Sequence, residues 1–145
     1  MRALALATVL LTAVPALAGF TPEQEKQLAE ATYVYIQSER KSGEWSTPAE
    51  IWFFVDGGKL YVGTRPQSWR VRRIRAGRTK ARIAIGSRSG PTFEATGEVV
   101  RDPAIEAKLM KAFAAKYPEG WARHEASFRE GFKTGERVLV AYTPR

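Results

Sequence analysis

The chain has 145 residues, of which 44% are hydrophobic, enough for one domain with its own core, and this composition excludes disordered and fibrous proteins. Lys and Arg number 23 against 15 Asp and Glu, and the resulting net charge of +8 favours an anionic partner, such as nucleic acid, an acidic membrane surface or a phosphorylated small molecule. The lack of cysteine and the single histidine, His124, exclude thiol catalysis and iron–sulfur clusters, and no metal site is expected within one chain.

Residues 1–18 have the pattern of an export signal. Arg2 precedes an almost wholly apolar run, residues 4–17, which is short for a membrane span, and Ala16 and Ala18 place small residues where a signal peptidase reads them. We expect cleavage after Ala18, a periplasmic or secreted protein without a stable membrane span, and a single mature domain of residues 19–145. An uncleaved anchor or a buried helix is the alternative.

The mature chain begins with a helix signal. Thr21 can cap a helix that starts at Pro22, Gln24 stands at the capping-box position, and the helix should end near Ala31. The β-branched and aromatic residues at 33–38 then predict the first strand.

A hairpin follows. The apolar run in residues 49–55 predicts a second strand that is buried on both faces. Asp56-Gly57-Gly58 is a hairpin signal, and residues 60–64 are predicted to return as the third strand.

The second half predicts two helices and three more strands. The helices are a short one at residues 68–75 and a longer one from Asp102-Pro103 to about Tyr117, and the strands are residues 79–85, 92–100 and 138–142. Trp45 and Trp121 fall in loop-like contexts and are interpreted as core or interface anchors. Six strands, mostly joined by hairpins and flanked by helices, indicate a small β-barrel of the α+β class.

The chemistry is concentrated in a basic segment that lacks acids. No acidic residue stands between Asp56 and Glu94, whereas residues 65–88 contain eight Arg and one Lys. Arginine is preferred where phosphate is bound by paired hydrogen bonds, and Thr64 and Ser68 add hydroxyl groups around a proline-containing turn. A solvated charged face is the ordinary alternative for such a run. The lack of acids and the strand–turn–helix setting favour an anion site.

These motifs together resemble the FMN-binding split barrel of the pyridoxamine 5'-phosphate oxidase-like superfamily, which also holds deazaflavin-dependent reductases. The resemblance covers nearly all of residues 21–117, including the turn that ends at Gly43 and the hairpin at Gly57-Gly58. It is closer still to an uncharacterised subgroup that has an Ile-Trp strand.

The resemblance implies a six-stranded antiparallel split β-barrel with flanking helices, which forms a homodimer with one flavin at each subunit interface. The cofactor phosphate would contact Thr64, Ser68 and Arg70, with Arg65 or Arg73 adding charge. Trp69 is placed either to cover a ring or to pack as an ordinary aromatic. The isoalloxazine ring would lie along a strand that offers it backbone hydrogen bonds, at residues Glu50, Ile51 and Trp52.

Three classes of function follow. The first is a flavin-dependent oxidoreductase using FMN or deazaflavin, in which the protein orients the cofactor; no catalytic acid or base is identified. The second is a module that binds flavin, haem or another anionic cofactor without turnover. The third, nucleic-acid binding, is disfavoured by the export signal. FMN is therefore the expected cofactor, while the substrate and the electron donor stay open.

Overall fold

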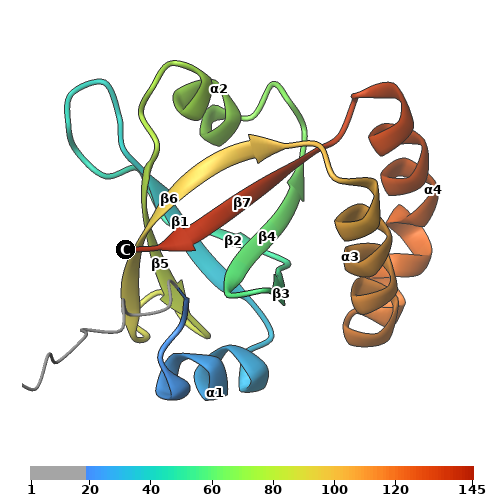
Figure 1. Cartoon of the computed structure of the whole chain (residues 1–145), viewed down its shortest axis with the longest axis horizontal. Coiled ribbons are helices and arrows are strands. Elements are labelled where there is room, and N and C mark those ends of the chain that lie inside the picture. The colour runs from blue at the N-terminus through green and yellow to red at the C-terminus, as the bar shows by residue number, and fades with distance from the viewer. Residues whose placement is uncertain (1–18) are drawn as a thin grey trace, which may run out of the picture.

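The computed structural model describes residues 19–145, so the predicted export signal lies outside the described residues. This part of the chain is an α+β fold with one antiparallel sheet and four helices (Figure 1). The strands lie in the order β2-β1-β5-β6-β7-β4-β3. The elements are α1 (Pro22–Glu30), β1 (Val34–Ser38), β2 (Ala49–Ile51), β3 (Phe54–Asp56), β4 (Lys59–Thr64), α2 (Trp69–Arg75), β5 (Lys80–Ile85), β6 (Thr92–Val100), α3 (Pro103–Lys116), α4 (Pro118–Thr134) and β7 (Val138–Pro144).

The prediction of six strands is wrong because the run 49–55 is two strands rather than one. β2 pairs with β1 and β3 pairs with β4, so the two short strands are opposite edges of the same sheet. Trp52 and Phe53 join them, and the backbone N–H of Phe53 donates to the hydroxyl group of Tyr117 at 3.3 Å instead of to a strand. The run is also not buried on both faces, since Glu50 is exposed.

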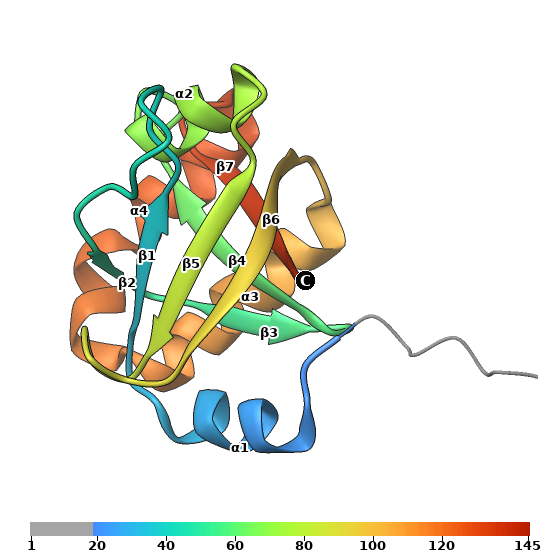
Figure 2. The same cartoon turned by 90° about the vertical axis from the view of Figure 1, so that its left-hand side faces the viewer.

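This connection forces the sheet to curl. The Cα atoms of Ile51 and Phe54 are three residues apart and so at most about 11 Å from each other. Seven flat strands would instead span roughly 29 Å between the edge strands. The two edges must therefore approach each other at this corner, and the sheet forms a half-barrel (Figures 1 and 2).

Helix α4 was not predicted, because Pro118 was interpreted only as the end of the preceding helix. Pro118 is instead the first residue of α4, and Gly135 ends the helix in the left-handed conformation (φ 84°). Trp121 therefore lies on a helix and not in a loop. It is buried, as are Phe128 and Phe132 on the same helix.

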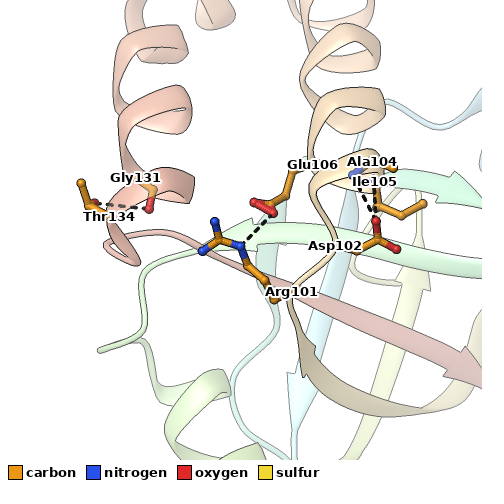
Figure 3. Close-up of polar contacts among 7 residues, drawn as sticks. All are labelled: Arg101, Asp102, Ala104, Ile105, Glu106, Gly131 and Thr134. Carbon is orange, nitrogen blue, oxygen red and sulfur yellow. Dashed lines mark hydrogen bonds and ion pairs between the residues drawn. The ribbon is translucent and has the colours of Figure 1, made fainter.

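Short-range polar contacts lie at the end of the α3–α4 pair where α3 begins and α4 finishes (Figure 3). Asp102 caps α3 by accepting hydrogen bonds from the backbone N–H groups of residues 104 and 105, at 3.1 and 3.2 Å. One turn into α3, the buried carboxylate of Glu106 lies 3.6 Å from Nε of Arg101. At the same end of the pair, where α4 finishes, the hydroxyl group of Thr134 donates to the carbonyl oxygen of Gly131 at 3.4 Å.

The core has two parts on the two faces of the curled sheet. Leu60, Val62 and Tyr142 belong to the part of the core that lies inside the curl with α1. Tyr61 on β4 and Leu139 on β7 belong to the other part, which packs against α3 and α4. This alternation is the period of two expected of a strand buried on both faces. The predicted capping box of α1 is confirmed, with Thr21 and Gln24 exchanging hydrogen bonds of 3.0 and 3.1 Å.

Candidate functional site

A pocket of about 420 Å³ lies at the end of the molecule where α2 meets the β1–β2 connection. Five of the residues that were predicted to bind a cofactor line it: Thr64, Ser68, Trp69, Arg70 and Arg73. The opposite wall comes from β1 and the chain that follows it, through Ile36, Ser38, Arg40, Ser46, Thr47 and Ala49. The pocket thus joins two segments that are about thirty residues apart in the sequence, and its only charged side chains are three arginines.

Helix α2 positions the arginines of this pocket. Ser68 caps the helix by accepting a hydrogen bond from the N–H of Val71, whose buried side chain anchors the helix in the core. Trp69 and Arg73 are four residues apart and so share a helix face, and the Arg73 guanidinium lies 5.3 Å from the centre of the Trp69 ring. Trp69 is 64% exposed, the one exposed large hydrophobic residue within residues 19–145.

Arg73 is held against the opposite wall. Its Nη1 donates a 2.9 Å hydrogen bond to Oγ of Ser38, the buried last residue of β1. Burial lowers the pKa of Arg73, and the positive charges of Arg40 and Arg78 lower it further. Arginine remains protonated at any physiological pH, so the positive charges of Arg40, Arg73 and Arg78 repel one another, and a bound anion would relieve this repulsion.

Arg70 has an unmet hydrogen-bonding requirement. Its Nε is buried and has no acceptor. The nearby hydroxyl group of Tyr142 is also buried without a partner; burial raises its pKa, and the charge of Arg70 acts in the opposite direction. A buried guanidinium nitrogen without an acceptor is costly, and Arg70 also lines the pocket in which an anion could bind.

The structure does not place the other predicted residues in this pocket. Arg65 lies in a separate hollow of about 400 Å³ with Gln67 and Arg137. Glu50 is exposed and accepts a 2.7 Å hydrogen bond from the hydroxyl group of Tyr35.

The residues after Glu50 also lie elsewhere. Ile51 packs against the core inside the curl, and Trp52 stacks on Tyr117 with ring centres 4.5 Å apart. The predicted contact of Glu50, Ile51 and Trp52 with a flavin ring stays a prediction. Ala49, one residue earlier, is the part of β2 that reaches the pocket.

Sequence reasoning missed the wall formed by Ser38, Arg40, Ser46 and Thr47. The turn ending at Gly43 was used only as a motif of the resemblance, and Gly43 does have the positive φ (87°) that such a turn requires. The signal that could have revealed Arg40 is its position in this turn, directly after a strand. Its proximity to α2 depends on strand pairing, which local sequence does not encode.

No protein-family model and no curated protein matches the sequence. Solved structures match the fold. A candidate pyridoxamine 5'-phosphate oxidase from Listeria innocua is 12% identical over 85% of this chain and 91% of its own, with a TM-score of 0.60. A heme storage protein from Vibrio cholerae is 13% identical over 88% and 91%, also with a TM-score of 0.60. An F420 reductase is 21% identical over 83% and 92%, with a TM-score of 0.53.

These similarities show which class of fold the chain has. The chain has the fold of the pyridoxamine 5'-phosphate oxidase-like proteins, as its motifs implied. At these identities the comparisons concern the fold, and the ligand must be argued from the pocket itself.

Proposed function

We propose that the protein is an exported split-barrel protein that binds FMN and acts as a flavin-dependent oxidoreductase. The observation that carries this proposal is the convergence of Arg40, Arg70 and Arg73 on one pocket that also contains five residues with hydroxyl groups and an exposed tryptophan. A flavin mononucleotide needs these three kinds of partner: cations and hydroxyl groups for its phosphate and an aromatic surface for its ring.

The pocket residues fit a phosphate monoester. Arg70 and Arg73 are the charged donors, and Thr64 and Ser68 supply hydroxyl groups beside them. Burial of Arg70 Nε without a partner supports an anion as the missing acceptor. A bound flavin would supply hydride-transfer chemistry, while the protein binds and orients it.

The split barrel and the homodimer are parts of the same proposal. The curled sheet with its edges joined at Trp52 is compatible with a split barrel. In a homodimer with the cofactor at the subunit interface, the flavin and the second subunit would cover the exposed Trp69, which otherwise leaves a large apolar surface in water. Helices long and apolar enough to cross a bilayer are not found within residues 19–145.

Binding without turnover is the second candidate. None of the eleven residues that line the pocket has a carboxyl or imidazole group, so the pocket offers an anion site but no proton donor that titrates near neutral pH. A heme storage protein shares the fold, which supports haem as an alternative ligand.

The absorption spectrum of the purified protein, before and after addition of FMN or haem, tests the ligand. We expect flavin bands, release of FMN on denaturation and thermal stabilisation by added FMN. Arg70→Glu should weaken FMN binding roughly tenfold to hundredfold, because it removes charged hydrogen bonds and adds repulsion. Arg75→Glu makes the same charge change on the same helix outside the pocket and should change the affinity little.

A colourless protein that is neither bound nor stabilised by FMN would overturn the flavin proposal, and a haem spectrum would favour the second candidate. Reduction of the bound flavin by a nicotinamide nucleotide and its reoxidation by an added acceptor would support the oxidoreductase. Retained flavin that no donor reduces would instead support binding without turnover. Export is tested separately, by determining the N-terminal residue of protein recovered from the periplasm or medium, which we expect to be Gly19.

A further inference from the structure

A second pocket, of about 640 Å³, lies on a different part of the molecule from the proposed flavin site. Its walls come from α1, the β3–β4 hairpin and α3. Helix α1 lies at the opposite end of the sheet from α2 (Figure 1). Its volume is typical of a site for a small molecule. Most of its wall is apolar or backbone, and its lining residues are Glu25, Leu28, Ala29, Phe53, Phe54, Val55, Asp56, Gly57, Gly58, Ala112 and Lys116.

Lys116 is the one basic residue in this lining. It ends α3, and its Nζ lies 3.6 Å from the centre of the Phe53 ring and 5.3 Å from that of Tyr117. Within the part of the chain that the structure describes, no carboxylate lies within ion-pair distance of this amine. The two acids of the pocket are Glu25 and Asp56, and Asp56 pairs with Lys108 at 3.7 Å.

The amine is therefore surrounded mainly by aromatic and apolar groups. Burial lowers the pKa of Lys116 to about 8, while the face of the Phe53 ring favours the charged form and opposes this shift. At pH 7.5 a lysine with such a pKa is roughly one-quarter free amine, compared with about 0.1% for an ordinary lysine. Lys116 is exposed as a residue although its amine lies against the Phe53 ring, and it lines the pocket.

We propose that Lys116 is a carbonyl-capturing residue, whose amine forms an imine with an aldehyde that has an apolar body and is bound in this pocket. The lone pair of Nζ attacks the carbonyl carbon and forms a C–N bond. The carbonyl oxygen then takes up protons and leaves as water, so that amine and aldehyde give imine and water without any oxidant or reductant.

The pocket favours an apolar aldehyde over an acid. Leu28, Val55 and Ala112 supply apolar surface for the body of the ligand. Glu25 and Asp56 would repel a carboxylate at the end nearest to them. This proposal does not depend on flavin binding, because it uses none of the residues that line the flavin pocket.

Lysine-specific trapping tests the proposal on the purified full-length protein. The protein is incubated at pH 7.5 with benzaldehyde and sodium cyanoborohydride, and the benzyl adduct on each lysine is quantified by peptide mass spectrometry. We expect Lys116 to react at least about tenfold faster than Lys111, an exposed lysine on the same helix, given the larger fraction of free amine. The rate at Lys116 should rise with pH and level off above about pH 9, roughly one pH unit above the pKa of about 8, where deprotonation of the amine is nearly complete.

Two variants separate the reactive amine from the pocket. Lys116→Arg should abolish the adduct at this position while the melting temperature stays unchanged. Ala112→Phe fills part of the pocket and should slow the reaction of Lys116 with benzaldehyde several-fold more than its reaction with formaldehyde, which needs no pocket. Equal rates at Lys116 and Lys111, or a rate at Lys116 that continues to rise up to pH 10, would overturn the proposal. Equal slowing of both aldehydes by Ala112→Phe would show that the pocket does not bind the ligand.

Discussion

Nη1 of Arg73 donates a 2.9 Å hydrogen bond to Oγ of Ser38, and this single bond joins α2 to the end of β1 across 35 positions of the chain. Ser38 is buried, so its hydroxyl group has little access to water when the bond is lost. The bond connects the two walls of the proposed flavin pocket. Arg73 would therefore donate hydrogen bonds to a ligand and also hold α2 against the end of β1.

Arg73→Ala should therefore lower the free energy of unfolding by about 1–3 kcal/mol, because it leaves a buried hydroxyl group without its donor. Urea unfolding at pH 7 measures the change. Arg72→Ala is the matched control, since Arg72 is exposed and makes no hydrogen bond to the other wall; its effect should stay within about 0.5 kcal/mol. Equal destabilisation by the two variants would show that the bond to Ser38 contributes nothing.

Trp69→Ala should separate stability from ligand binding. Because 64% of the residue is exposed, its removal should change the free energy of unfolding by less than about 0.5 kcal/mol. If the indole covers the flavin ring, the same change should weaken FMN binding by about 1 kcal/mol, or fivefold, while Trp69→Phe retains most of the affinity. Flavin fluorescence titration measures both variants, and unchanged affinity in Trp69→Ala would remove this residue from the site.

The buried phenol of Tyr117 predicts a loss of stability in alkali. Its hydroxyl group donates to the carbonyl oxygen of Thr32 at 2.6 Å, and burial raises its pKa from 10 to about 12. Between pH 10 and pH 12 the Tyr117 hydroxyl group ionises in the unfolded chain but stays protonated in the folded one. The stability is fully present below pH 10 and decreases as the pH rises towards 12, by up to about 1.4 kcal/mol per pH unit.

Urea unfolding between pH 9 and 12 tests this dependence. Other tyrosines with raised pKa values, such as Tyr142, contribute to the same slope, so the informative quantity is the difference between the protein and Tyr117→Phe. The variant should be less stable at pH 8, because the buried backbone N–H of Phe53 loses its acceptor and the Thr32 carbonyl loses its donor, and its stability should decrease less steeply above pH 10. Parallel curves would contradict the assignment to Tyr117.

Gly120 is predicted to be intolerant of substitution. A Cβ atom there would lie 2.5 Å from the Trp52 ring, which packs against Phe113, Tyr117 and His124. Gly120→Ala should destabilise the fold by about 1–3 kcal/mol, despite the higher helix propensity of alanine. Near-ultraviolet circular dichroism should show a changed Trp52 signal, whereas Glu119→Ala, at the exposed neighbouring position, should leave it unchanged.

Much of the fold could be predicted because its signals are local. Capping at Thr21, the hairpin at Gly57 and the helix start at Asp102 each depend on residues within four positions of one another. The passage of the chain from β2 to β3 at Trp52 could not be predicted in this way. An apolar run of this length has the same sequence pattern whether it forms one strand or two short strands at different edges of a sheet. Helix α4 had a readable signal, since Trp121, Phe128 and Phe132 are spaced by seven and four residues, which is a helical repeat.

The candidate site was predictable on one of its walls only. Ser68, Arg70 and Arg73 lie within six consecutive residues of a basic segment whose composition indicates an anion site, and the family resemblance selects these three within it. The facing wall at Ser38 and Arg40 depends on the register of β1 with β2 and β5, which is a long-range property. Arg65 was included for its charge alone, and charge does not indicate which side of a turn a residue occupies.

The two ends of the sheet, β2 and β3, are only three residues long each. An unpaired strand edge exposes backbone groups to which another chain can add, and the hazard increases with the length of the edge. Here the chain passes directly from one edge to the other, so that neither presents a long template. The fold therefore offers another chain little unpaired backbone for strand addition.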